Sequence, residues 1–101
     1  MSKRNINLPK GELAELCRRR HIRKMSLYGS VLRDDFRPDS DIDVLVEFEP
    51  GHTVGFEILD IEEELSRLFG GQRVDIVEEK YLNRWLRARV LATAEVQYAE
   101  G

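Results

Sequence analysis

Three aspartates in this sequence have the chemistry and spacing of residues that bind divalent cations. Asp41 and Asp43 stand two positions apart at the start of an apolar run. Side chains in a strand alternate between faces, so these two carboxylates point the same way, within about 7 Å of each other. Like charges that close repel, and burial makes the repulsion worse. Magnesium relieves it, because Mg²⁺ takes one or two carboxylates together with substrate phosphates.

Asp75 is the third member of this set. It lies between Val74 and Ile76, so in a strand the two apolar side chains face one side and the carboxylate the other. If that strand pairs beside Asp41 and Asp43, three carboxylates converge, enough to hold two metal ions about 4 Å apart.

Gly29-Ser30 supplies a second kind of chemistry. A glycine that ends a strand lets the backbone approach a ligand closely, and free N–H groups at the start of the next turn bind anions. The Ser30 hydroxyl adds a donor. Phosphates held here and metals held by the aspartates would favour in-line displacement at an α-phosphorus, with pyrophosphate leaving. Taken alone, Gly-Ser is commonly a turn, Asp-Ile-Asp the polar start of a strand, and Asp75 an edge aspartate. The hypothesis of a catalytic site therefore depends on their combination.

The surrounding sequence predicts an α/β (α+β) domain with a short mixed sheet of three or four strands flanked by helices. Leu13, Leu16 and Cys17 share one helical stripe, and Gly70-Gly71 stops a later helix. Val44, Leu45 and Val46 form a continuous run, which predicts a strand covered on both faces. The predicted elements are a helix from Pro9 to the basic run at Arg18–His21, strands Ile22–Tyr28, Asp41–Phe48 and Arg73–Glu78, helices Val54–Phe69 and Tyr81–Ala92, and an edge strand around Val96 and Tyr98.

Length and composition limit the class of protein. The 101 residues predict a polar tail over 1–7 and a single domain over 8–101. No run approaches the roughly 20 apolar residues that span a bilayer, so no membrane association is expected. One cysteine fits a reducing, cytoplasmic setting. The net charge of −3 argues against stable nucleic-acid binding.

Several other side chains are expected to have structural roles. The basic run that begins at Arg18 is interpreted as a solvated helix end rather than an RNA or partner contact. Trp85, with arginines around it, is expected to pack into the core, although a partner contact is the alternative. Cys17 is expected in the core, and His21 and His52 as isolated residues outside any metal site. Glu62, Glu63 and Glu64 are expected to form a solvent-exposed helix face.

The spacing Gly29-Ser30, ten residues, then Asp41-Ile-Asp43 resembles the signature of the DNA polymerase beta-like nucleotidyltransferase superfamily. Asp75 falls where that superfamily places its third acidic residue. The resemblance runs from about Met25 to Val77, and the short chain resembles the minimal nucleotidyltransferase (MNT) branch. It implies a palm-like fold and an antitoxin that transfers AMP from ATP to a tyrosine of a HEPN-type RNase toxin.

The resemblance also implies roles for individual residues. Gly29 and Ser30 would bind the triphosphate, with Arg33 as a further phosphate contact. The catalytic, metal-binding residues would be Asp41, Asp43 and Asp75, which hold two Mg²⁺ ions with ATP as substrate. Asp34-Asp35 departs from the family, which often has glycine after the arginine.

Two other functions remain open at this point: an antitoxin that only masks the toxin in a hetero-oligomer, and a transferase with a small-molecule acceptor. The sequence does not decide the nucleotide base or the acceptor.

Overall fold

The computed structural model describes residues 9–29 and 41–100. The predicted class is confirmed: the chain forms a four-stranded mixed sheet with helices on both faces. Its elements are α1 (Lys10–Arg19), β1 (Ile22–Tyr28), β2 (Ile42–Phe48), α2 (Glu57–Leu68), β3 (Val74–Glu78), the 3₁₀ turn η2 (Glu79–Tyr81), α3 (Arg84–Thr93) and β4 (Glu95–Ala99).

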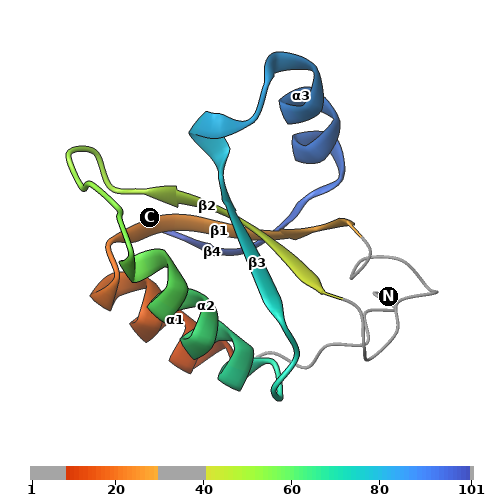
Figure 1. Ribbon diagram of the computed structural model, residues 1–101. Helices are drawn as coiled ribbons and strands as arrows, with labels where there is room; N and C mark the ends of the chain where they lie inside the picture. The colour runs from red at the N-terminus through yellow and green to blue at the C-terminus, as the bar shows by residue number, and fades with distance from the viewer. Residues whose placement is uncertain (1–8, 30–40, 101) are drawn as a thin grey trace.

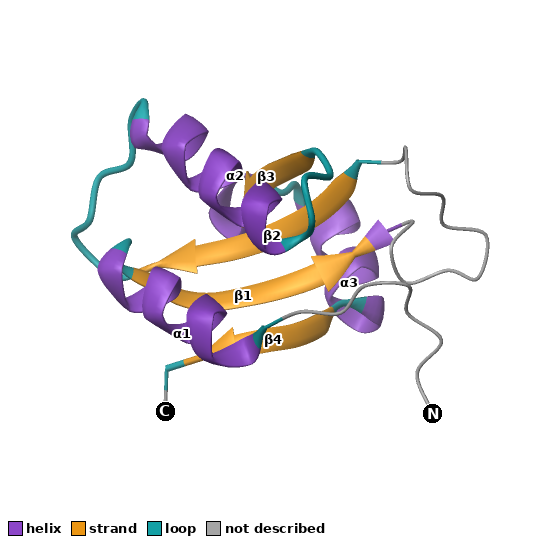
Figure 2. Cartoon of the chain, turned by 90° about the horizontal axis from the view of Figure 1, so that it is seen from below, coloured by secondary structure: helices purple, strands orange, loops and turns teal. Residues whose placement is uncertain are grey.

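The strands are ordered β3-β2-β1-β4 across the sheet. β1 runs antiparallel to both β2 and β4, whereas β2 and β3 are parallel. A parallel pair needs a crossover, and α2 provides it. Helices α1 and α2 lie together on one face of the sheet and α3 lies on the other (Figures 1 and 2).

The main core lies between the sheet and the helices α1 and α2. Ile42, Val44 and Val46 are fully buried there against residues such as Leu13 and Ile61. Leu45 points to the opposite face and is also buried, at 2% exposed. The double coverage predicted from the apolar run is therefore confirmed, and the alternation of β2 defines which residues face α3.

The two later helices begin after their predicted starts. The helix predicted from Val54 begins at Glu57 and ends before Gly70 and Gly71, whose φ angles of 78° and 95° suit glycine. The helix predicted from Tyr81 is preceded by η2, and α3 starts at Arg84. Asn83 fixes that start, because its side chain accepts a hydrogen bond from the Leu86 N–H at 2.8 Å.

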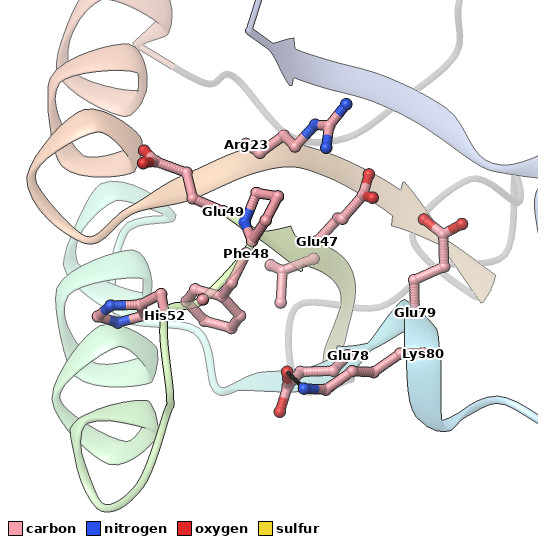
Figure 3. A pocket seen from close by; sticks show the side chains of 11 residues that line it. Arg23, Glu47, Phe48, Glu49, His52, Glu78, Glu79 and Lys80 are labelled. Carbon is pink, nitrogen blue, oxygen red and sulfur yellow. Dashed lines mark ion pairs between the residues drawn. The ribbon is translucent and has the colours of Figure 1, made fainter.

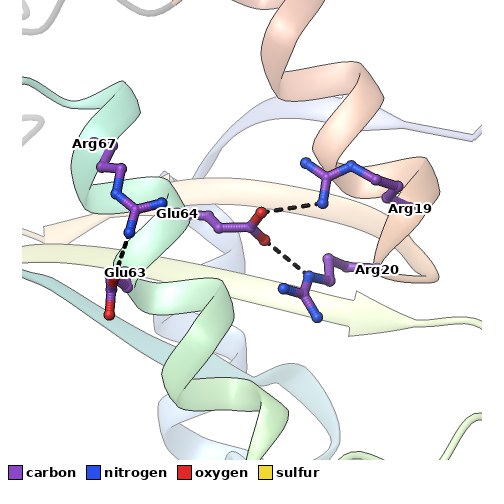
Figure 4. A network of polar contacts seen from close by, with 5 residues as sticks. All are labelled: Arg19, Arg20, Glu63, Glu64 and Arg67. Atoms are coloured by element: carbon purple, nitrogen blue, oxygen red, sulfur yellow. Dashed lines mark hydrogen bonds and ion pairs between the residues drawn. The ribbon is translucent and has the colours of Figure 1, made fainter.

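Polar contacts tie the two helices of the core face together, and they correct two expectations (Figure 4). Glu64 accepts from Arg20 Nε at 2.8 Å and from Arg19 Nη1 at 3.0 Å, so these arginines are not simply solvated. Glu62 accepts the backbone N–H of Ile76 at 3.0 Å, across the α2–β3 interface. Glu63 alone of the three glutamates has the expected exposed position, where it pairs with Arg67.

Two further expectations about ring side chains were wrong. His21 and His52 are not isolated: their rings stack with centroids 4.4 Å apart and join the α1–β1 turn to the β2–α2 turn. Trp85 is not in the core but 80% exposed on α3. Cys17 is buried in the core as predicted.

Candidate active site

The end of β1 and the beginnings of β2 and β3 meet at one end of the sheet. Tyr28 of β1 lies opposite Asp43 of β2, and Asp43 lies opposite Asp75 of β3. The strand of Asp75 lies directly beside the strand of Asp43, so the condition stated for the sequence is met for these two carboxylates. The register therefore places a phenol and two carboxylates in one row across three strands.

This row faces away from α1 and α2. The neighbours of Asp43, Ile42 and Val44, belong to the core on the α1/α2 side, as does Val74 beside Asp75. Alternation then directs the two carboxylates to the opposite face, over which α3 lies (Figure 1). Because the apolar residues of each strand are buried on the α1/α2 side, the acidic residues between them face the opposite side.

The electrostatics of Tyr28 support this arrangement. Burial raises the pKa of its phenol, and the charges of Asp43 and then Asp75 raise it further. Both carboxylates are therefore close enough to act on the Tyr28 phenol. Adjacent carboxylates that repel each other suit a divalent cation, so the donor set fits Mg²⁺. The sequence interpretation missed Tyr28, although its place at the end of the strand before Gly29 was visible.

Gly29 follows Tyr28 with a φ of 77°, in the left-handed region that favours glycine. A Cβ atom at this position would lie 2.5 Å from Oδ2 of Asp43. A side chain at this position would displace the Asp43 carboxylate, a reason for glycine that the sequence did not reveal. Its predicted contact with phosphate stays a prediction.

Asp41 precedes β2 and stands apart from this pair. Its side chain is 49% exposed, and Oδ1 lies 4.0 Å from Nη1 of Arg73. Within residues 9–29 and 41–100, no three acidic, histidine or cysteine side chains are arranged to hold a metal ion. The convergence of Asp41 with the other two aspartates stays a prediction. The exposed ion pair between Asp41 and Arg73 is weak, so it would not prevent Asp41 from binding a cation instead.

The remaining predicted residues, Ser30 and Arg33, lie outside the described residues, as does Asp34-Asp35. Their roles in phosphate binding therefore also stay predictions.

A pocket of about 240 Å³ lies at the far end of the sheet, where β2 and β3 finish (Figure 3). It has two cations in its lining, Arg23 and Lys80, and the latter lies 3.8 Å from Glu78. Its glutamates are Glu47, Glu49, Glu78 and Glu79. None of the predicted site residues that the structure describes lines this pocket, and it lies at the opposite end of the sheet from Asp43 and Asp75.

No helix in the described part of the chain is long and apolar enough to cross a membrane.

Comparison with known proteins agrees with this geometry. The nucleotidyltransferase domain family matches residues 11–95. Protein adenylyltransferase MntA of Thermococcus cleftensis is 35% identical over 77 residues, which cover 76% of each chain. A solved structure described as a candidate minimal nucleotidyltransferase is 39% identical, with a TM-score of 0.70 over 84% of this chain and 85% of that one.

A more distant match shares the fold alone. It is a chain in the complex of the tri-AMPylated HEPN toxin of Shewanella oneidensis with MNT antitoxin, with 17% identity and a TM-score of 0.64 over 89% of this chain and 69% of that one. The match over residues 11–95 and the relatives above 30% identity assign the family. This chain belongs to the nucleotidyltransferase domain family, and within it to the minimal nucleotidyltransferases.

Proposed function

We propose that this protein is an antitoxin that transfers AMP from ATP to a hydroxyl group of a HEPN-type RNase toxin. The acceptor that we propose is the hydroxyl of a tyrosine. The direct pairing of Asp43 with Asp75 beside Tyr28 supports the proposal, because two adjacent carboxylates could hold a cation that in turn binds a triphosphate. The relatives agree with this chemistry: one is named a protein adenylyltransferase, and the more distant complex holds an AMPylated toxin.

In the proposed reaction, the acceptor oxygen bonds to the α-phosphorus while the bond from that phosphorus to the pyrophosphate oxygen breaks. Pyrophosphate leaves, and the proton of the acceptor hydroxyl passes to the Asp75 carboxylate, which faces solvent at the start of β3. Mg²⁺ held by Asp43, Asp75 and Asp41 would neutralise the charge of the phosphates. Gly29 keeps the space that Asp43 needs, and Ser30 and Arg33 would hold the leaving phosphates.

The test is intact-mass spectrometry of the toxin after incubation with ATP, Mg²⁺ and substoichiometric antitoxin. We expect the toxin to gain one or more AMP units with the wild type and none with Asp43→Ala. Asp60→Ala changes an exposed aspartate of α2, away from the row, and should transfer AMP normally.

An antitoxin that acts only by masking the toxin would give a different set of results. Neutralisation would then need equimolar antitoxin, would not depend on ATP, and would survive Asp43→Ala. A toxin that is fully inhibited but unmodified would overturn the transferase proposal. A transferase for small molecules would release pyrophosphate with other acceptors while the mass of the toxin stayed unchanged.

A further inference from the structure

Helix α3 is held to the rest of the protein by few of its own residues. Val90 is its one buried residue, whereas Trp85 is 80% exposed and Leu86 is 45% exposed. An isolated helix of ten residues is marginal in water, so most of its stability has to come from packing. Trp85 and Leu86 therefore leave apolar surface on α3 that the described part of this chain does not cover.

The side of α3 that faces away from the sheet is defined by helical geometry. At about 100° per residue, Arg84, Trp85 and Arg89 point roughly 100–140° away from Val90. Ala88 lies between them and leaves the surface low around Trp85. We call Arg84, Trp85 and Arg89 the α3 surface.

The α3 surface is positively charged in a chain whose net charge is −3. From Lys80 to Ala94 there is no acidic residue, while Lys80, Arg84, Arg87 and Arg89 are all cations. Arg87 lies 3.9 Å from Glu79. Within the part of the chain that the structure describes, Arg84 and Arg89 make no ion pair. Two cations beside an exposed tryptophan complement a surface with the opposite charge.

The position of this surface connects it to the chemistry. α3 lies over the face of the sheet to which Asp43 and Asp75 point, near the end where β1 finishes (Figures 1 and 2). A molecule seated on the outer side of α3 is therefore on the same side of the sheet as the carboxylate row. A molecule bound to α1 or α2 would instead lie on the opposite side of the sheet from these carboxylates.

We propose that the α3 surface docks an acidic segment of the acceptor protein and so brings its hydroxyl to the Asp43–Asp75 end of the sheet. The proposal rests on the proposed function, since it names the acceptor as a protein. Trp and Arg are the residues that most often dominate binding in protein interfaces. Glu78 and Glu79 on one side and Glu95 on the other border the basic segment, so an extended nucleic acid would meet carboxylates at both ends.

The test compares Arg84→Glu/Arg89→Glu with a matched control, Arg18→Glu/Arg67→Glu, which makes the same charge change on α1 and α2. Arg84→Glu places an acid in the first turn of α3, where it favours the helix, so the variant should fold. Affinity for the HEPN-type toxin is measured without nucleotide, and AMP transfer is measured separately as KM for the toxin and kcat.

We expect the α3 variant to raise the Kd and the KM for the toxin at least 10-fold, with kcat changed less than about twofold. The control should change neither, and wild-type Kd should rise more steeply with salt than that of the variant. Trp85→Ala should weaken binding by a similar factor, and its effect should not depend on salt.

The outcomes separate the two proposals. Toxin that binds the wild type but gains no AMP overturns the proposed transfer, and the Kd of the variants still tests the docking surface. A Kd equal to that of the control, or a wild type that does not bind the toxin, overturns the docking surface. Binding of a labelled single-stranded RNA that only the α3 variant loses, with toxin affinity unchanged, would make the surface an RNA site and overturn it too.

Discussion

The Asp43 carboxylate fills the space in which a side chain on residue 29 would begin, since a Cβ atom there would lie 2.5 Å from Oδ2. A side chain on residue 29 would therefore displace the Asp43 carboxylate, and glycine avoids this conflict. Because Gly29 also has a φ of 77°, any replacement meets a backbone cost in addition to the contact.

Gly29→Ala is therefore expected to reduce AMP transfer by about 100-fold or more, because Asp43 has to move from the row it shares with Asp75. The matched control is Gly70→Ala. Gly70 has a φ of 78°, but nothing lies within 4 Å of the added Cβ. Both variants should lose roughly 1–2 kcal/mol of stability from the backbone. Equal activity in the two variants would contradict the proposed role of Gly29.

Asp75→Asn is expected to stabilise the protein in EDTA while it removes the stabilisation by Mg²⁺-ATP. Neutralising one carboxylate relieves its repulsion with Asp43, by about 0.5 kcal/mol for a solvent-exposed position, or a few degrees in Tm. In the wild type, Mg²⁺ and ATP together should raise Tm more than either alone. Thermal scans of wild type, Asp75→Asn and the control Asp60→Asn measure this. A full Mg²⁺-ATP shift in Asp75→Asn would count against the site.

Cys17 is expected to resist alkylation at pH 8 until the protein unfolds. Burial raises the pKa of its thiol to about 12, compared with 9.0 for an ordinary thiol. As pH rises, the thiol of Cys17 ionises in the unfolded chain before it does so in the folded protein. The free energy of unfolding that this buried thiol contributes is therefore complete below pH 9 and is lost as pH rises toward 12. Urea unfolding at pH 7 and pH 10.5 should show a smaller pH effect for Cys17→Ala than for the wild type. An equal effect would assign the alkaline loss to other groups.

Glu64→Gln is expected to cost about 1 kcal/mol at pH 7 through the bonds to Arg19 and Arg20. Burial raises the pKa of Glu64, but hydrogen bonds from Arg20 and Arg19 outweigh it and bring the pKa below its usual value. The contribution is therefore present above the ordinary glutamate pKa and disappears as pH falls through the lower native value.

The control for that variant is Glu63→Gln, which breaks the exposed pair with Arg67 one position away. It should cost no more than a few tenths of a kcal/mol. Urea midpoints at pH 7 and pH 3 distinguish the two variants. A loss for Glu64→Gln that persists at pH 3 would show that packing, not charge, is responsible.

Local pattern was enough to predict the parts of the fold that depend on periodicity and turn residues. The first strand has the predicted bounds Ile22–Tyr28, and Leu13, Leu16 and Cys17 are buried as the helical stripe required. The neighbouring position of Asp43 and Asp75 was also predictable, because a strand, a helix and a second strand form a parallel pair.

Features that depend on three-dimensional contact were not predictable in the same way. His21 and His52 stack because two turns meet at one end of the sheet, which no local spacing records. Trp85 looked like a core residue because tryptophan usually is one, yet α3 turns Val90 inward instead. The clearance between Gly29 and Asp43 required the register of β1 against β2.

The hydrogen bond from the Ile76 N–H to Glu62 has a consequence for the protein in a crowded solution. β3 is an outer strand of the sheet, and such a strand offers backbone donors to any other extended chain. Ile76 sits in the middle of that strand, and α2 has already used its donor with a charged side chain. A second copy, or a misfolded neighbour, therefore finds the central backbone donor of this outer strand already occupied by Glu62.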